Sequence, residues 1–365
     1  MSRYIGIAPR VKRAAEGEAR PTMVCIRAGK KPELLKLETE QEELNFVLNS
    51  LQIGDIISMT LGGCGDNFAF ALSTRSEQLG GGTKVIRIPP YILKQERGDS
   101  DKDQDHILLS ELAESKPQIF SEVVLRDRKT IKVRECLRVR TDIMKARIAC
   151  EQRLRQRFIG QIFCSEAGLY PQGGIEKAFD EIEANDLTLK ALMAEEAKAE
   201  RELKKAVEAT DVFKNVLEQV EGCGFLIASR IISAVGDIRR FETAPKLKKF
   251  LGVHVLDDGR FPRRRNSEIA NWNNEARQAL YLLGEQFNRR PDSVWGKYLR
   301  LCKLRLREKH PEKITAEAGK TRYNDGHIHK MGSWRCRSRF VEWLFKEWWK
   351  LERAGIEKTT GEVKV

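Results

Sequence analysis

The sequence predicts an α/β domain over residues 1–115, an antiparallel helical hairpin over residues 116–219, an all-α domain over residues 220–353 and a tail at residues 354–365. Three observations support this division. Short β-rich runs alternate with helical runs at the start of the chain, two long helical runs follow, and the rest is helical and basic. A chain of 365 residues also exceeds the size at which a single hydrophobic core keeps growing, so several domains are expected.

In the first region, four short runs have the composition of strands: residues 3–8, 22–28, 55–61 and 83–89. Helical patterns cover residues 39–51 and 67–79. Thr39 and Glu42 have the spacing of a capping box at the start of the first of these helices. The glycines that precede the second helix lack the spacing of a phosphate-binding loop, so they indicate an ordinary strand-to-helix turn.

The second region contains two helical runs separated by a Gly- and Pro-rich break around Pro171. Apolar residues recur along each run with helical spacing, at Leu137, Met144, Ile148, Leu154, Phe158 and Ile162, and at Ile175, Phe179, Ile182, Leu189 and Met193. We therefore expect an antiparallel coiled coil. The first arm, counted over residues 122–157, has 12 basic and 5 acidic residues. The second arm, counted over residues 176–208, has 6 basic and 10 acidic residues. The arms could pair with each other, or the basic arm could lie on nucleic acid, and both interpretations stay open.

The overall charge indicates a polyanionic partner. Lys plus Arg number 66 against 53 Asp plus Glu, which gives a net charge of +13 and favours nucleic acid over a membrane. The longest apolar runs are strand-sized, far below the roughly 20 residues that span a bilayer, and the start lacks a signal-peptide pattern. A cytoplasmic, nucleoid-associated protein is expected. The eight cysteines form no C-x-x-C pair, so neither a disulfide framework nor a metal site is predicted.

The third region holds the most distinctive local motif, "VEGCGFLIASRIISAVGDIRRF". Gly222 and Gly224 precede an apolar helix that ends at Gly236, which is the form of a helix-hairpin-helix-like element. The backbone N–H groups of such a turn can bind a phosphate without reading bases. A glycine-capped core helix is the alternative. The basic residues that follow favour nucleic-acid binding: Arg239, Arg240, Lys246, Lys248 and Lys249.

Two further features of this region are candidates for contacts. Arg263, Arg264 and Arg265 form a basic run that we expect to contact phosphates, and Trp272 follows in a polar stretch. Aromatic and apolar side chains near the end recur every four residues, at Phe340, Leu344 and Trp348. Their spacing predicts a core or a subunit interface.

Residues 220–287 resemble the C-terminal domain of the insertion sequence 110 family of transposases, which includes the pilin-gene invertases. The resemblance rests on the G-x-G turn, "GDIRRF", "LKKFLGV", the basic stretch and "EARQALYLL". The "YIGIA" strand and the acidic cluster after "VIRIPPYILKQ" are similar to that family's RuvC-like domain of RNase H fold, with the hairpin as connector. The resemblance implies DNA as a partner, a structured guide RNA held beside it, and assembly as a homodimer or homotetramer.

The resemblance also implies a DNA recombinase that uses four carboxylates and a serine. This chain departs from the family at those positions. Ala8 stands at the first acid and Gly62 or a neighbour at the second, with Asp66 beyond the glycine turn. The later acidic residues are separated by even steps only, so none has the family's spacing: Asp99, Asp101, Asp103 and Asp105.

Asp258 replaces the serine that the resemblance implies before the basic run. Two-metal phosphoryl transfer needs converging oxygen ligands, and alanine or glycine side chains offer none. We therefore predict a catalytically silent relative that keeps its nucleic-acid-binding surfaces and needs no cofactor.

Two alternatives stay open. Asp101 and Asp105, one helical turn apart, could bind Mg²⁺ together with Asp66 while Ser267 replaces the lost serine, which would give an active transposase or site-specific recombinase. Such an acidic turn is more typical of a solvated loop, and Ser267 is typical of a helix N-cap. The other alternative is a structural coiled-coil protein whose basic surface serves assembly.

Overall fold

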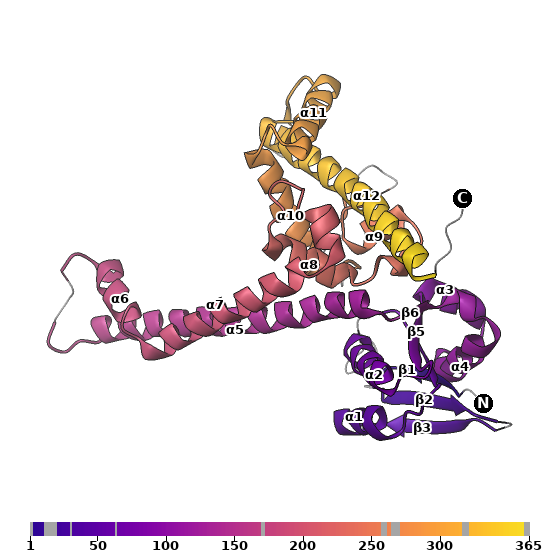
Figure 1. Ribbon diagram of the computed structural model, residues 1–365. Coiled ribbons are helices and arrows are strands. Elements are labelled where there is room, and N and C mark those ends of the chain that lie inside the picture. The colour runs from indigo at the N-terminus through magenta and orange to yellow at the C-terminus, as the bar shows by residue number, and fades with distance from the viewer. Residues whose placement is uncertain are drawn as a thin grey trace.

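The computed structural model describes residues 3–10, 20–29, 31–62, 64–168, 172–256, 261–263, 271–315 and 321–360. Its N-terminal part is built on a six-stranded mixed sheet of order β3-β2-β1-β4-β5-β6 (Figure 1). The strands are β1 (Tyr4–Ala8), β2 (Thr22–Arg27), β3 (Glu33–Leu37), β4 (Ile56–Thr60), β5 (Lys84–Ile88) and β6 (Ser121–Glu122). β1, β4 and β5 run parallel, and the pairs β1–β2, β2–β3 and β5–β6 are antiparallel.

Side-chain alternation along β1 determines which helix lies on which face of the sheet. The helices are α1 (Glu40–Asn49), α2 (Asp66–Leu79), α3 (Pro90–Arg97) and α4 (Asp105–Ser115). Ile5 and Ile7 are buried in a cluster with side chains of α1 and α2. Gly6 faces α4 instead, and a Cβ there would lie 2.0 Å from a backbone oxygen of α4. Ser58, the register partner of Gly6, donates to the Leu109 carbonyl of α4 at 2.9 Å. The close approach of α4 therefore depends on small residues in two adjacent strands.

The strands and helices predicted for this part are confirmed as β1, β2, β4, β5, α1 and α2, whereas β3, β6, α3 and α4 were not predicted. Thr39 caps α1, since its hydroxyl accepts a hydrogen bond from the Glu42 N–H at 3.2 Å. The Glu42 carboxylate accepts from the Glu38 N–H at 2.7 Å. Only half of the predicted capping box therefore forms.

Three helices extend away from the sheet: α5 (Leu125–Phe163), α6 (Ile175–Glu183) and α7 (Leu187–Glu208). α5 follows β6 directly, and α7 lies along it (Figure 1). Of the predicted seam, Leu137, Ile162, Phe179 and Leu189 are buried, whereas Ile148 is 37% and Met193 is 44% exposed. The two arms lie side by side, but their apolar seam is only partly closed.

Ion pairs join the arms. Glu196 of α7 pairs with Arg140, at 3.1 Å, and with Arg147, both on α5. Arg155 of α5 pairs with Glu176 of α6. The arms therefore pair with each other, as one of the two interpretations of their opposite charges predicted. Nucleic-acid binding by the basic arm stays a prediction.

The C-terminal part contains a π-helical turn (Phe213–Leu217) and five helices: α8 (Phe225–Val235), α9 (Ala244–Phe250), α10 (Asn274–Arg289), α11 (Val294–Lys309) and α12 (Asp325–Thr360). Two short strands, β7 (Ile314–Thr315) and β8 (Thr321–Arg322), form an antiparallel ribbon that was not predicted. α12 continues to Thr360, into the segment predicted as a tail. Within the described ranges, no helix is long and apolar enough to cross a membrane.

One hydrophobic core joins the base of the hairpin to the C-terminal part. Val133 of α5 and Val207 of α7 are fully buried in the same cluster as side chains of α8, α10 and α12. Phe340, Leu344 and Trp348 belong to this cluster and are at most 3% exposed, so they are core residues. The hairpin therefore rests on the C-terminal part at its base and extends beyond it (Figure 1).

Candidate functional site

The carboxyl ends of the parallel strands β1 and β4 form one edge of the sheet. Ala8 is the last residue of β1, and Gly62 follows β4. The next turn passes close to the end of β1, because a Cβ on Gly65 would lie 2.6 Å from the Pro9 side chain. α2 then begins at Asp66. The two positions where the resemblance implies acids therefore lie at the same edge, and Asp66 is the carboxylate beside them.

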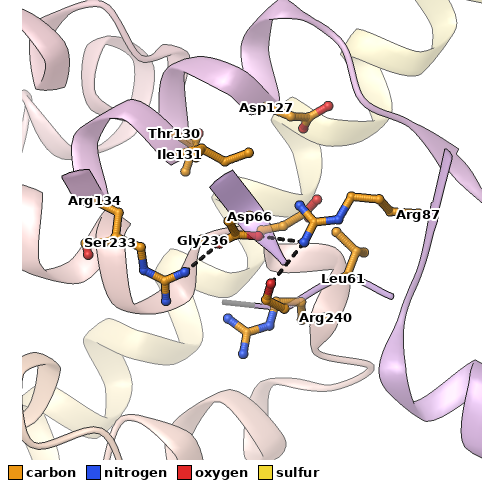
Figure 2. Close-up of a pocket in the computed structure, with 12 residues that line it drawn as sticks. Leu61, Asp66, Arg87, Asp127, Thr130, Ile131, Arg134, Ser233, Gly236 and Arg240 are labelled. Carbon is orange, nitrogen blue, oxygen red and sulfur yellow. Dashed lines mark hydrogen bonds and ion pairs between the residues drawn. The ribbon is translucent and has the colours of Figure 1, made fainter. Parts of the chain in front are cut away.

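Asp66 lies between two arginines (Figure 2). Its Oδ1 accepts a hydrogen bond from Nη2 of Arg87 at 2.6 Å, and its Oδ2 accepts one from Arg134 of α5. Arg87 belongs to strand β5 and is only 4% exposed, although it is charged. Arg240 lines the same cavity of about 20 Å³, which has space for about one water molecule. Three segments that are distant in sequence thus place three guanidinium groups around this carboxylate.

These residues do not fit a Mg²⁺ ion, which prefers oxygen ligands such as carboxylates. Both oxygens of Asp66 already accept hydrogen bonds from guanidinium groups. The positive charges of Arg87 and Arg134 would repel a divalent cation at this distance. Ala8 and Gly62 offer no side-chain oxygen. This edge therefore has the electrostatics of an internal ion-pair network rather than of a metal centre.

The other predicted carboxylates also have local structural roles. Asp101 caps a short 3₁₀ helix (Lys102–Gln104), since it accepts a hydrogen bond from the Asp103 N–H at 3.0 Å. Asp105 is buried and accepts two hydrogen bonds from Arg97 of α3, at 2.6 and 2.8 Å. Over the part of the chain that the structure describes, no three potential metal ligands come together. Asp66, Asp101 and Asp105 are therefore not gathered into one site.

Arg239 and Arg240 are withdrawn from the surface. Arg239 is 6% exposed and donates hydrogen bonds to Asp237 at 2.6 Å and to Asp127 at 2.8 Å. Burial lowers the pKa of Arg239, but the attraction of these carboxylates outweighs it and the net pKa is raised. Arg240 is half-buried and donates to the Val235 carbonyl at 2.9 Å. The predicted contact of these two arginines with nucleic acid does not fit this placement, because their guanidinium groups are engaged inside the protein.

Gly222 and Gly224 form the predicted turn before α8. Gly222 has a φ of +90°, and a Cβ there would lie 2.6 Å from the Cβ of Gln286 on α10. Gly224 is the exposed N-cap of α8, which has no side-chain cap. The first N–H groups of α8 therefore lack a capping side chain. Phosphate binding at this turn stays a prediction.

The three predicted lysines around α9 differ in their surroundings. Lys246 is exposed and pairs with Glu242, and Lys248 lies 3.2 Å from Glu342 of α12. Lys249 is exposed, and among the described residues it has no ion pair. Of the three, Lys249 is the one that best fits an open phosphate contact.

The segment 261–263 and the start of α10 meet around Arg277. Nη2 of Arg277 donates a hydrogen bond to the Pro262 carbonyl at 2.8 Å, which holds the exposed Arg263 beside α10. The guanidinium carbon of Arg277 lies 4.3 Å from the ring centre of Trp272. Burial lowers the pKa of His254, and the nearby charges of Lys249 and Arg277 lower it further. The structure therefore brings the predicted residues Lys249, Arg263 and Trp272 to one region.

We call Lys249, Arg263, Trp272 and Arg277 the basic aromatic face. Arg264, Arg265, Ser267 and Asp258 lie outside the described residues. Three arginines were not predicted: Arg87 and Arg134 beside Asp66, and Arg277 in the basic aromatic face. Arg87 carried a signal, because a charged residue inside a strand expected to be buried needs a partner. Arg134 is one of many cations on the basic helix α5, and Arg277 lies on α10, where acidic and basic residues are equal in number, so neither position gave a signal.

Residues 214–298 match the sequence model of the family described as Transposase IS116/IS110/IS902. The matched segment begins in the π-helical turn and ends in the first turns of α11. It therefore includes the Gly222–Gly224 turn and all of the basic aromatic face. No curated protein matches the chain.

Proposed function

We propose that the protein binds DNA as a catalytically silent relative of DNA recombinases, and the premise is the match of residues 214–298 to the IS116/IS110/IS902 transposase family. The observation that carries the proposal is the pairing of Asp66 with Arg87 and Arg134. The resemblance implies metal ions at this edge of the sheet, and here guanidinium groups surround the carboxylate instead. Ala8 and Gly62 add no oxygen ligand. The chain thus has a transposase domain without the carboxylates that two-metal chemistry needs.

The N-terminal sheet supports an RNase H-like, RuvC-like assignment of this part. β1 has the antiparallel strands β2 and β3 on one side and the parallel strands β4 and β5 on the other. α5 and α7 then form the coiled-coil connector that the resemblance implies. The part from residue 220 onward is the DNA-binding domain.

DNA binding is supported by the net charge of +13 and by the basic aromatic face. Lys249 and Arg263 are exposed cations that can contact phosphates. The N–H groups at the uncapped start of α8 can donate hydrogen bonds to a further phosphate. A structured guide RNA beside the DNA and a homodimer or homotetramer belong to the same proposal, because the resemblance implies them. A cytoplasmic, nucleoid-associated location follows from DNA as the partner.

A cleavage assay tests the proposal. The full-length protein is incubated with Mg²⁺ and duplexes that carry the sequences flanking its gene, and both binding and strand cleavage are measured. We expect binding without nicking or strand transfer. Cleavage that disappears in Asp101→Ala or Asp105→Ala would overturn the silent assignment. It would support an active transposase that uses Asp66, Asp101, Asp105 and Ser267.

A structural coiled-coil protein is a second candidate, and the partly exposed seam at Ile148 and Met193 favours it. Such a protein would use its basic surface for assembly with other copies. The two candidate functions differ in whether the protein binds DNA at low ionic strength. Absence of DNA binding together with self-association through the hairpin would support the structural function and contradict ours.

A further inference from the structure

Aromatic rings and guanidinium groups alternate in a stack between α10 and α12. In order, its members are Trp272, Arg277, Trp334, Arg337 and Tyr281. The guanidinium carbon of Arg277 lies 4.3 Å from the ring centre of Trp272 and 5.0 Å from that of Trp334. The guanidinium carbon of Arg337 lies 5.1 Å from the ring centre of Trp334 and 5.6 Å from that of Tyr281. We call these five residues the aromatic-arginine stack.

The arginines of this stack, Arg277 and Arg337, are not paired with a carboxylate in the part of the chain that the structure describes. Arg337 is 5% exposed, and its Nε donates to the Ser333 carbonyl at 3.1 Å. Glu285 lies nearby, but its carboxylate is 3.7 Å from Nε2 of His329. A buried charge without a counter-ion is unfavourable, so an anion bound here would be stabilised.

The electrostatics of Arg337 agree with this geometry. Burial and, to a smaller extent, the charge of Arg277 together lower the pKa of Arg337 to about 10. Two like charges thus lie close together in an environment of low polarity. A phosphate would relieve both the burial cost and the mutual repulsion.

The stack is covered at one end and open at the other. Gly252 covers Trp272, because a Cβ on Gly252 would lie 2.8 Å from Cγ of that ring. Tyr281 at the other end is 53% exposed and lies one helical turn after Arg277 on α10. A further planar group can therefore extend the stack over Tyr281, on the face opposite Arg337.

We propose that the aromatic-arginine stack binds one unpaired nucleotide, with its base on the ring of Tyr281 and its phosphate attracted by the positive charges of Arg277 and Arg337. This inference rests on the proposed nucleic-acid-binding function and adds the kind of nucleotide that is bound. A base within a duplex has both faces covered, so only a single-stranded or extruded base can stack on Tyr281. Stacking uses the π-face that every base has, so the site tolerates many sequences. DNA and RNA share this chemistry.

Fluorescence anisotropy with three labelled oligonucleotides tests the inference: a thymidine-rich single-stranded DNA, a uridine-rich RNA and a blunt DNA duplex. We expect Tyr281→Ala to weaken binding of a single strand by about 5- to 100-fold and to leave binding of the duplex unchanged. Tyr281→Phe keeps the ring and should bind as the wild type does. Leu304→Ala, at a side chain of α11 that is 61% exposed, is a matched truncation and should change neither affinity.

Arg277→Gln tests the phosphate contact. Its plot of log affinity against log salt concentration for the single strand should be shallower by about 0.7, the contribution of one phosphate. An unchanged slope would remove the phosphate from the site. If Tyr281→Ala binds single strands as tightly as the wild type, or loses duplex affinity equally, the stacking inference is wrong while nucleic-acid binding stands. A wild type that binds none of the three oligonucleotides overturns the proposed function itself.

Discussion

Nη2 of Arg239 lies 2.8 Å from Oδ1 of Asp127, a residue that precedes it by 112 positions. This contact joins the start of α5 to the segment after α8. Glu352 of α12 completes the cluster, since its Oε2 lies 2.8 Å from Nη2 of Arg126 and 4.0 Å from Nε of Arg239. Ionisable groups from three separate parts of the chain therefore meet in a buried cluster, where the hairpin and the end of α12 join the C-terminal core.

The first prediction concerns pH. Burial raises the pKa of Glu352 from 4.5 to about 7, against the attraction of Arg126 and Arg239. The stability contributed by the protonated carboxyl is therefore fully present below about pH 4.5 and is lost as the pH rises through about 7. This shift corresponds to about 3 kcal/mol. We expect the free energy of unfolding of Glu352→Gln to lie within about 1 kcal/mol of the wild-type value at about pH 5. At about pH 8 it should exceed the wild-type value by about 3 kcal/mol.

Urea unfolding followed by tryptophan fluorescence measures this difference. Glu347→Gln, on the same helix and paired with Lys350 at 2.7 Å, is the control and should shift stability by less than about 1 kcal/mol at either pH. A Glu352→Gln protein that is less stable than the wild type at the higher pH would show that Arg126 stabilises the ionised carboxylate.

The second prediction concerns Asp66. Asp66→Asn leaves the buried guanidinium of Arg87 without a carboxylate, and breaking a buried pair from one side costs about 3 to 5 kcal/mol. The six tryptophans all follow residue 270, so circular dichroism is the better probe of the N-terminal domain. Asp103→Asn, whose pair with Arg20 is more than half exposed, should cost less than about 1 kcal/mol. Equal losses in the two variants would contradict an Asp66-centred network.

The fold could be predicted where apolar patterning was strong. The strands β1, β2, β4 and β5 are rich in branched apolar residues, which favour buried strands. β3 has mostly exposed residues and no clear alternation, so it forms only because β2 offers a free edge. α3 begins with Pro90 next to β5, and its short apolar content does not distinguish it from a loop.

The site was less predictable, because ion pairs between distant segments leave no local pattern. The sequence places Arg239 and Arg240 in a basic run, which is typical of an exposed surface. In the structure Arg239 pairs with Asp127 on another helix, and Arg240 donates to the Val235 carbonyl. Trp272 and Arg263 were predicted separately. Arg277 contacts both Pro262 and Trp272, but in the sequence it is a single cation on a helix, which is typical of a solvent-facing position.

The third prediction concerns the turn before α8. Gly222→Ala places a side chain at a φ of +90° and within 2.6 Å of Gln286, so we expect a loss of about 2 to 4 kcal/mol in the free energy of unfolding. Gly160→Ala, in α5 where a Cβ meets nothing within 4 Å, should stabilise by about 0.5 to 1 kcal/mol. Urea unfolding measures both. A neutral Gly222→Ala would mean that the turn can adopt another conformation.

The fourth prediction concerns the hairpin. Glu196 is 12% exposed and pairs with both Arg140 and Arg147, so Glu196→Gln should lower stability by about 1 to 2 kcal/mol at low salt and less at high salt. Glu195→Gln is the matched change at the preceding residue. Glu195 is 60% exposed and lies 4.0 Å from Lys198, so its loss should stay below about 0.5 kcal/mol. Indistinguishable melting curves for the two variants would mean that the arms are held by apolar contacts alone.

The fifth prediction separates phosphate contacts from general basicity. Replacing Arg263, Arg264 and Arg265 by alanine should reduce the slope of log affinity against log salt for duplex DNA by roughly 2 to 3, because each phosphate contact contributes about 0.9. The control removes the same charge from α7, at Lys198, Lys204 and Lys205, which are at least 55% exposed and lie near glutamates of their own helix. Its slope should match the wild type. If both triple variants reduce the slope equally, DNA responds to net charge rather than to this basic run, and the basic aromatic face is not where phosphates bind.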